Sequence, residues 1–133
     1  MHARLYHHIV WTTLDRAPLL DAPRARFLSQ YLPAVASRFG VTILETGIVS
    51  THIHLLVRLS TTSTSMARLL QGFKGGSATR INREFIGRKD HRLRWAPSYS
   101  AKSVGEVSLD RVRQYVRRQA EHHPDERISG WPE

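Results

Sequence analysis

The stretch VTILETGIVSTHIHLLVRL, residues 41–59, contains two runs that are rich in β-branched and aliphatic side chains. The runs are Val41–Val49 and His52–Leu59, and only Ser50-Thr51 separates them. Such residues favour extended strands, and a two-residue connection is typical of antiparallel hairpins. We therefore predict a β-hairpin here, although the Asn-Gly signal of many tight hairpin turns is missing.

The second strand of this hairpin carries a His-Ile-His motif. Because side chains alternate along a strand, His52 and His54 share one face and lie about 7 Å apart along the backbone. The aliphatic side chains at positions 53, 55 and 57 take the other face, where helices can cover them. We expect the histidines on the open side of the sheet, at a spacing that lets both bind one divalent ion. Two solvated or hydrogen-bonded histidines would show the same pattern.

The segments upstream of the hairpin predict a strand followed by a helix. Tyr6–Thr13 is rich in β-branched and aromatic residues. A helix can begin near Asp21, has Pro23 in its first turn, and ends before Gly40.

Three more elements are expected after the hairpin. Ser63 or Ser65 can cap a helix that is interrupted or broken at Lys74-Gly75-Gly76-Ser77. Leu93–Ser100 is a short strand candidate, and its Pro97 favours an edge or a bulge. A last helix, capped by Ser108, has one apolar face through Ala120 and ends before Pro124.

The expected order is therefore β-α-β-β-α-β followed by a helix. This order is typical of an α+β, ferredoxin-like antiparallel sheet with helices on one side. The additional C-terminal helix carries Tyr115. We expect one domain over residues 1–133, in which residues 124–133 form a short C-terminal tail.

Composition narrows the class of protein. The 133 residues include no cysteine, which excludes disulfide scaffolds, cysteine zinc sites and thiol chemistry. The longest uncharged stretch, Thr46–Val57, is too short to cross a membrane, so we expect no membrane association. The first residues lack the apolar core of a signal peptide, and we expect a cytoplasmic protein.

Positive charge is concentrated in one part of the chain. Residues 68–118 hold 13 Lys or Arg and 4 Asp or Glu, whereas the remaining residues hold 7 of each, so this segment carries the whole net charge of +9. Of the 20 basic residues, 17 are arginine, whose planar guanidinium suits bidentate phosphate contacts. We expect a polyanionic partner, and a basic surface that only serves solubility is the alternative.

The last helix places Tyr115 and Gln119 one turn apart on the same face. Each residue alone is compatible with a packing or capping role. Considered with the other motifs, however, the sequence resembles the Y1 transposases of the IS200/IS605 type, single-strand DNA transposases of the HUH nuclease superfamily. The matching segments occur in family order: YHHIVWTT, HIH with LLVRL, GFKGGSATRINRE, W-x3-Y-x3-SVG and VRQYVRRQAEHH. Ser98 departs from the glycine expected there, and the tail is short.

The resemblance implies a chemistry for these residues. Tyr115 would be the nucleophile that stores the energy of the broken phosphodiester as a 5′-phosphotyrosine and leaves a free 3′-OH. His52, His54 and Gln119 would hold a divalent ion that polarises the scissile phosphate. Mg²⁺ is expected in cells, and Mn²⁺ is expected to substitute for it.

The resemblance also implies partners. The substrate would be single-stranded DNA, with hairpins at the ends of a mobile element. A homodimer would share its active sites between subunits, because the link at Gly105 could let the tyrosine helix reach the partner's sheet. Residues that could contact DNA phosphate are Lys74, Arg80, Arg83, Arg117 and Arg118.

The remaining tyrosines and the histidines that flank these motifs are expected to be structural. Packing roles are expected for Tyr6, Tyr31 and Tyr99, and structural or helix-capping roles for His7, His8, His122 and His123.

Other functions fit less well. A domesticated or replication-type HUH endonuclease would use the same chemistry. A noncatalytic RNA or single-strand DNA binder with a ferredoxin-like sheet would stack bases on aromatic residues, but there is no aromatic residue between Thr42 and Thr64. The scattered acids disfavour a two-metal nuclease, and no phosphate-binding loop for ATP is present.

Overall fold

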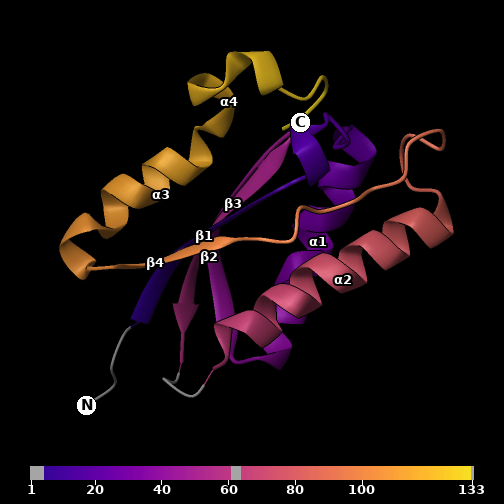
Figure 1. Cartoon of the computed structure of the whole chain (residues 1–133). Helices are drawn as coiled ribbons and strands as arrows, with labels where there is room; N and C mark the ends of the chain where they lie inside the picture. Colours follow the sequence, from indigo (N-terminus) through magenta and orange to yellow (C-terminus); the bar gives the residue numbers. More distant parts are fainter. Residues whose placement is uncertain (1–4, 61–63, 133) are drawn as a thin grey trace.

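A computed structural model describes residues 5–60 and 64–132. Four strands form one antiparallel sheet in the order β2-β3-β1-β4 (Figure 1). The strands are β1 (Leu5–Thr12), β2 (Val41–Val49), β3 (His52–Leu59) and β4 (Ser100–Val104). The helices are α1 (Ala22–Arg38), α2 (Met66–Glu84), α3 (Leu109–Arg117) and α4 (Gln119–His122), and short 3-10 turns cover Leu14–Arg16, Glu106–Ser108 and Pro124–Glu126. The expected α+β fold and order of elements are confirmed.

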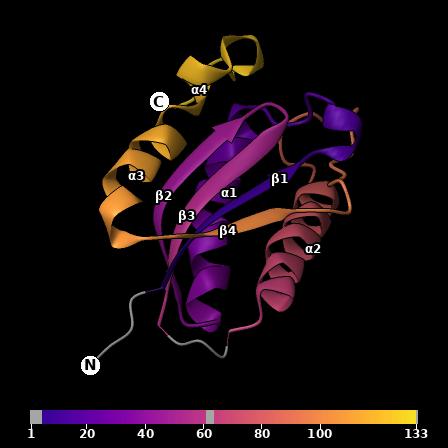
Figure 2. The ribbon, with the colours of Figure 1, turned by 60° about the vertical axis from the view of Figure 1, so that its left-hand side comes forward.

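Alternation along β3 gives the sheet two different faces. Ile53, Leu55 and Val57 are fully buried in the apolar core, together with Leu28 and Leu32 of α1 and Leu69 and Phe73 of α2. The opposite face lies under α3 and α4 (Figures 1 and 2). The expectation that this face is open was therefore wrong, since only 3% of His52 and 7% of His54 is exposed.

The predicted hairpin is confirmed with its bounds. Val49 pairs with His52, and Ser50-Thr51 makes the connection. The register shifts between Ile43 and Glu45, which is the pattern of a β-bulge. The shift places Glu45 on the opposite face of β2 from Ile43. Glu45 pairs with Leu56 and Gly47 pairs with His54, on the face that α3 covers.

The predicted interruption of α2 was wrong, because the helix continues through Gly75 and Gly76. A Cβ atom on Gly76 would lie 2.0 Å from the hydroxyl oxygen of Tyr31, which belongs to α1. Gly76 therefore allows the two helices to approach each other. Ser65 caps the helix by accepting a hydrogen bond from the Arg68 N–H, while Ser63 lies outside the described residues.

The fourth strand begins later than predicted. Residues 93–99 do not form a strand: Asn82 binds both the N–H and the C=O of Leu93, and Trp95 makes only an isolated bridge with Thr13. Pro97 has no N–H to donate to a ladder, so regular pairing with β1 starts at Ser100.

The last helix is also shorter than predicted. Ser108 precedes α3, but its side chain does not cap the helix. Helical geometry ends at Arg118, whose φ of −100° and ψ of 31° separate α3 from α4. Tyr115 and Gln119 therefore lie on opposite sides of a break. Within the part of the chain that the structure describes, no helix has the length and apolar character to cross a membrane.

Candidate active site

The structure brings four predicted site residues together between the sheet and the C-terminal helices. His52 and His54 belong to β3, Tyr115 belongs to α3, and Gln119 belongs to α4. The ring centroids of His54 and Tyr115 are 5.7 Å apart, and Nε2 of His52 is 3.4 Å from Oε1 of Gln119. Gln119 is 1% exposed and Tyr115 is 40% exposed. The site thus combines buried polar atoms with a tyrosine that solvent can reach.

Gly47 allows α3 to lie this close to the sheet. A Cβ atom at this position would be 2.0 Å from the carbonyl oxygen of Val116 and 2.9 Å from Cγ of Gln119. Even a methyl group would therefore push the end of α3 away from β2. Gly47, which pairs with His54 in the sheet, therefore allows Gln119 to lie close to His52.

We expect Gly47→Ala to destabilise the protein by roughly 1–3 kcal/mol, the usual cost of overpacking, and to loosen α3. Thermal unfolding and amide hydrogen exchange of α3 measure both effects. Gly75→Ala is the matched control, because a Cβ there meets no atom within 4 Å. That control should stabilise the helix by about 0.5–1 kcal/mol. Wild-type protection of α3 in Gly47→Ala would contradict the steric argument.

Thr51 and Glu126 orient His52. The Thr51 hydroxyl lies 2.6 Å from Oε1 of Glu126 and 2.9 Å from Nδ1 of His52. Burial raises the pKa of Glu126, but hydrogen bonds from Thr51 and Arg16 outweigh burial and hold the pKa below its usual 4.5. The ionised carboxylate can only accept, so the hydroxyl donates its one proton to Glu126 and accepts from His52. His52 then carries its proton on Nδ1, and its Nε2 offers a lone pair.

Gln119 presents an acceptor to that same nitrogen. Its amide Nε2 donates to the carbonyl oxygen of Tyr115 at 2.9 Å, which leaves Oε1 facing His52. The imidazole nitrogen and the amide oxygen are then two acceptors 3.4 Å apart, with no proton between them. A cation bound by both atoms would satisfy this pair, so the donor set fits a divalent ion.

His54 is paired with a histidine that we had expected to be only structural. Its Nδ1 lies 2.8 Å from Nε2 of His8, and the two rings stack. Burial, together with the neighbouring His52 and His8, lowers the pKa of His54 to about 3. Burial also lowers the pKa of His52 and of His8. All three imidazoles are thus neutral near pH 7, the form that binds metal ions.

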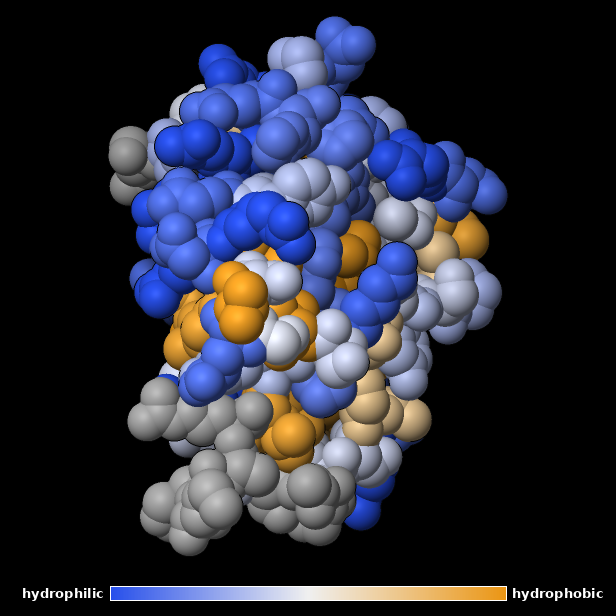
Figure 3. Space-filling view, turned by 90° about the vertical axis from the view of Figure 1, so that its left-hand side faces the viewer, coloured by the Kyte–Doolittle hydropathy of each residue, from blue (hydrophilic) through white to orange (hydrophobic). Residues whose placement is uncertain are grey.

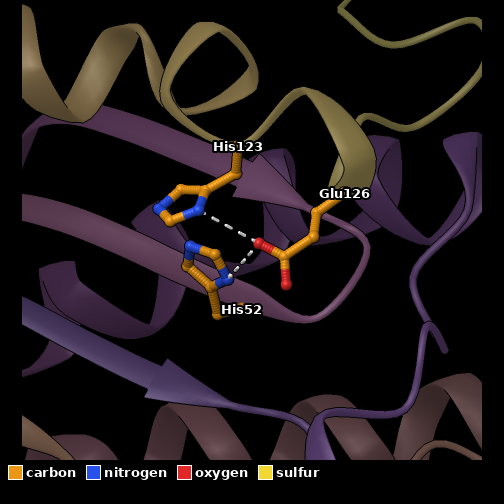
Figure 4. Close-up of side chains that lie close together, drawn as sticks. All are labelled: His52, His123 and Glu126. Atoms are coloured by element: carbon orange, nitrogen blue, oxygen red, sulfur yellow. Dashed lines mark ion pairs between the residues drawn. The ribbon is translucent and has the colours of Figure 1, made fainter.

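Three residues at the C-terminal end complete the surroundings of the site. His122 lies against Tyr115 with ring centroids 4.8 Å apart, and Nδ1 of His123 is 3.3 Å from Oε2 of Glu126. Possible ligand atoms of His52, His123 and Glu126 lie within 4.8 Å of one another, a second arrangement that could hold a cation (Figure 4). From the sequence alone, capping roles are expected for both histidines, and no role is expected for the tail that holds Glu126.

The residues expected to contact DNA fall into two groups. Lys74, Arg80 and Arg83 belong to α2, behind the sheet as seen from Tyr115. Lys74 donates to the carbonyl oxygens of Ala96 and Ser98, Arg80 pairs with Glu84, and Arg83 lines a cavity of about 470 Å³. Arg117 and Arg118 are exposed beside Tyr115.

Glu45 holds α3 against the sheet by contacts with two arginines. Its Oε2 accepts from Nε of Arg113 at 3.2 Å and from Nη2 of Arg117 at 3.0 Å. Burial raises the pKa of Glu45, but these two hydrogen bonds outweigh it and place the pKa below its usual 4.5. The contacts therefore depend on an ionised carboxylate.

This lowered pKa predicts a pH dependence of stability. The unfolded state binds a proton at Glu45 more readily than the folded state, so the stabilisation is complete above pH 4.5 and is lost as the pH falls through the folded pKa. We expect Glu45→Gln to cost about 1 kcal/mol at pH 7 and less at pH 3, where the unfolded carboxyl is protonated. Urea unfolding at both pH values measures the difference. An equal cost at both would contradict the ionic role of Glu45.

Comparisons with known proteins agree with this fold. The family model described as "Transposase IS200 like" matches residues 1–119. None of the curated proteins compared with the chain matches it. The crystal structure of a candidate transposase from Deinococcus radiodurans is similar, with a TM-score of 0.69, 22% identity, and coverage of 97% of this chain and 95% of that one. A REP-associated tyrosine transposase bound to a REP hairpin has a TM-score of 0.71 at 10% identity, covering 92% of this chain and 71% of that one.

Proposed function

The chain belongs to the family of IS200-like transposases, and from this premise we propose that it cleaves and rejoins single-stranded DNA through a covalent bond to Tyr115. The observation that carries the proposal is the position of this tyrosine. Its ring lies 5.7 Å from that of His54, and its partial exposure leaves room for a DNA strand.

The reaction balances without a co-reactant. The Tyr115 oxygen gives up its proton and attacks the scissile phosphorus, while the bond from phosphorus to the 3′ oxygen breaks. That oxygen takes up a proton and leaves as a free 3′-OH, and the 5′ phosphate stays on the tyrosine. Attack of a 3′-OH on the phosphotyrosine restores a phosphodiester and frees Tyr115. The phosphodiester energy is stored in the protein–DNA bond throughout, so no ATP is required.

His52, His54 and Gln119 would hold the divalent ion, Mg²⁺ in cells with Mn²⁺ as a substitute. When bound, it would polarise the phosphate and stabilise charge on the leaving oxygen. Support comes from the two facing acceptors on His52 and Gln119 and from the neutral state of His54. The arrangement with His123 and Glu126 is less suitable, because Nδ1 of His52 is already engaged by Thr51.

The DNA would include hairpins, as in the complex of the REP-associated transposase. The test is incubation with labelled single strands from the genomic flanks of the gene in Mn²⁺, followed by denaturing electrophoresis. A labelled band that migrates with the protein is expected, together with joined products. Cleavage without joining would indicate a replication-type HUH endonuclease, and absence of any adduct would indicate a noncatalytic binder.

Joining two DNA ends requires two nucleophiles held together, so the proposal includes a homodimer with shared active sites. Within one chain, α3 lies over its own sheet. In the link before α3, Val107 is fully exposed, and a Cβ on Gly105 would meet no atom within 4 Å. Exchange of α3 between subunits would therefore break no packing at these two positions of the link.

Mixing two inactive variants tests this exchange. A His52→Ala/His54→Ala double variant and a Tyr115→Phe variant should each be inactive, and mixed dimers should regain one working site if the helix acts on the partner's histidines. Subunit exchange is confirmed separately by mass spectrometry. Mixed dimers that remain inactive would show that each chain uses its own tyrosine.

A further inference from the structure

An open pocket with a volume of about 410 Å³ lies between α4, the end of α3 and the chain segment 127–132. Three arginines and an indole line it: Arg117, Arg118, Arg127 and Trp131. Hydrophilic residues dominate the upper part of the face in Figure 3, at the height of α4. We call this surface the tail pocket, and its volume is in the range of small-ligand sites.

The charge in the tail pocket is only partly balanced. Arg117 pairs with Glu45 at 3.0 Å, and Arg118 is 4.0 Å from Glu121. The guanidinium of Arg127 has neither an ion pair nor a hydrogen bond to any residue in the described ranges 5–60 and 64–132. The pocket therefore has a net positive charge, and one of its cations is available for an anionic ligand.

The wall that carries Arg127 and Trp131 is anchored to the domain. The Ser50 N–H donates to the carbonyl oxygen of Glu126 at 2.8 Å, and Ile128 is 5% exposed within the core. Trp131 packs against that core, and its backbone N–H donates to the carbonyl oxygen of Ile128 at 3.2 Å. The pocket is thus built from fixed elements.

The position of the pocket links it to the proposed chemistry. Arg117 and Arg118 occupy the two positions after Val116, between Tyr115 and Gln119, where α3 ends. A DNA strand that is bound at Tyr115 and continues along the end of α3 would reach these arginines, which line the pocket. Guanidinium groups bind phosphate, and an indole offers a stacking surface to any unpaired base.

We infer that the tail pocket binds one unpaired nucleotide of the same DNA strand that would be cleaved at Tyr115. Arg127, Arg118 and Arg117 contact its phosphate, and its base stacks on Trp131. The inference rests on the proposed function, since it places the same DNA strand. A base-paired nucleotide cannot offer its face to the indole, so the site distinguishes single strands from duplex.

Binding is tested on the full chain in EDTA, where no cleavage occurs, with a fluorescein-labelled oligothymidylate of about eight nucleotides. Arg127→Gln should weaken binding roughly threefold to tenfold, and it should reduce the slope of log K against log salt by about 0.7, the value for one lost phosphate contact. The matched control is Arg38→Gln, because Arg38 is also an exposed arginine and lies at the C-terminal end of α1. Equal effects of both variants would overturn the inference, because only net charge would then matter.

Stacking of a base on Trp131 is tested by quenching of tryptophan fluorescence. The oligothymidylate should quench tryptophan fluorescence in the wild type, whereas Trp131→Leu should lose this quenching and bind at least about fivefold more weakly. A duplex of the same length should quench neither protein. Unchanged quenching in Trp131→Leu would show that no base stacks there. Circular dichroism confirms folding, and Arg127→Gln keeps the inference testable if the tryptophan variant unfolds.

The outcomes separate the pocket from the catalytic proposal. If Arg127→Gln weakens binding more than Arg38→Gln does, and the wild type forms no adduct in Mn²⁺, the results support the pocket and refute the tyrosine chemistry. Adduct formation with equal effects of Arg127→Gln and Arg38→Gln would support the chemistry and refute the pocket.

Discussion

Tyr115→Phe is expected to abolish the covalent protein–DNA adduct while single-strand binding stays within about twofold of the wild type. The change removes only the phenolic oxygen that would attack phosphorus. The ring contacts of Tyr115 with His8, His54 and His122 involve the aromatic face or edge, which phenylalanine retains. Denaturing electrophoresis measures the adduct, and fluorescence anisotropy in EDTA measures binding.

Tyr99→Phe is the matched control for this experiment. Tyr99 and Tyr115 are both 40% exposed, but only Tyr115 lies against the histidines of β3. The control should form the adduct at the wild-type rate. An adduct that survives Tyr115→Phe and disappears in Tyr99→Phe would transfer the role of nucleophile to Tyr99.

The second large effect concerns the metal ion. His52→Ala should weaken Mn²⁺ binding by more than about 100-fold, because loss of a ligand costs more than the 10–100-fold that is typical of an outer partner. Calorimetry in the absence of DNA measures the affinity. His91→Ala is the control, since His91 is exposed and pairs only with Asp90 among the described residues. Both site histidines are buried, so thermal unfolding must confirm that each variant is folded.

Further variants distinguish the two possible ligand sets. If His52, His54 and Gln119 hold the ion, Gln119→Ala should abolish tight binding of the ion. Glu126→Gln should weaken binding only about tenfold, because it removes the acceptor that orients His52 through Thr51. If His52, His123 and Glu126 hold the ion instead, Glu126→Gln and His123→Ala should abolish binding and Gln119→Ala should have no effect.

Local patterns were sufficient to predict several features. Alternation in β3 placed His52 and His54 opposite the aliphatic side chains, and the two-residue connection predicted the hairpin. The order of elements predicted the α+β sheet. These features could be predicted because strand and helix geometry repeat over a few residues. The single helix face expected for Tyr115 and Gln119 was not found, because the helix breaks at Arg118.

Only the tertiary structure decided which distant segments meet. Strand alternation puts His7 and His8 on opposite faces, but only the pairing of β1 with β3 places His8 beside His54. No local pattern connects Glu126 with Thr51 or explains why Gly47 must lack a side chain. The covering of the histidine face by α3, the start of β4 at Ser100 and the uninterrupted α2 likewise depend on contacts between elements. The repeat of strand or helix geometry determines to which face of an element a side chain points. Which residues of other elements it contacts depends on how the elements pack when the chain folds.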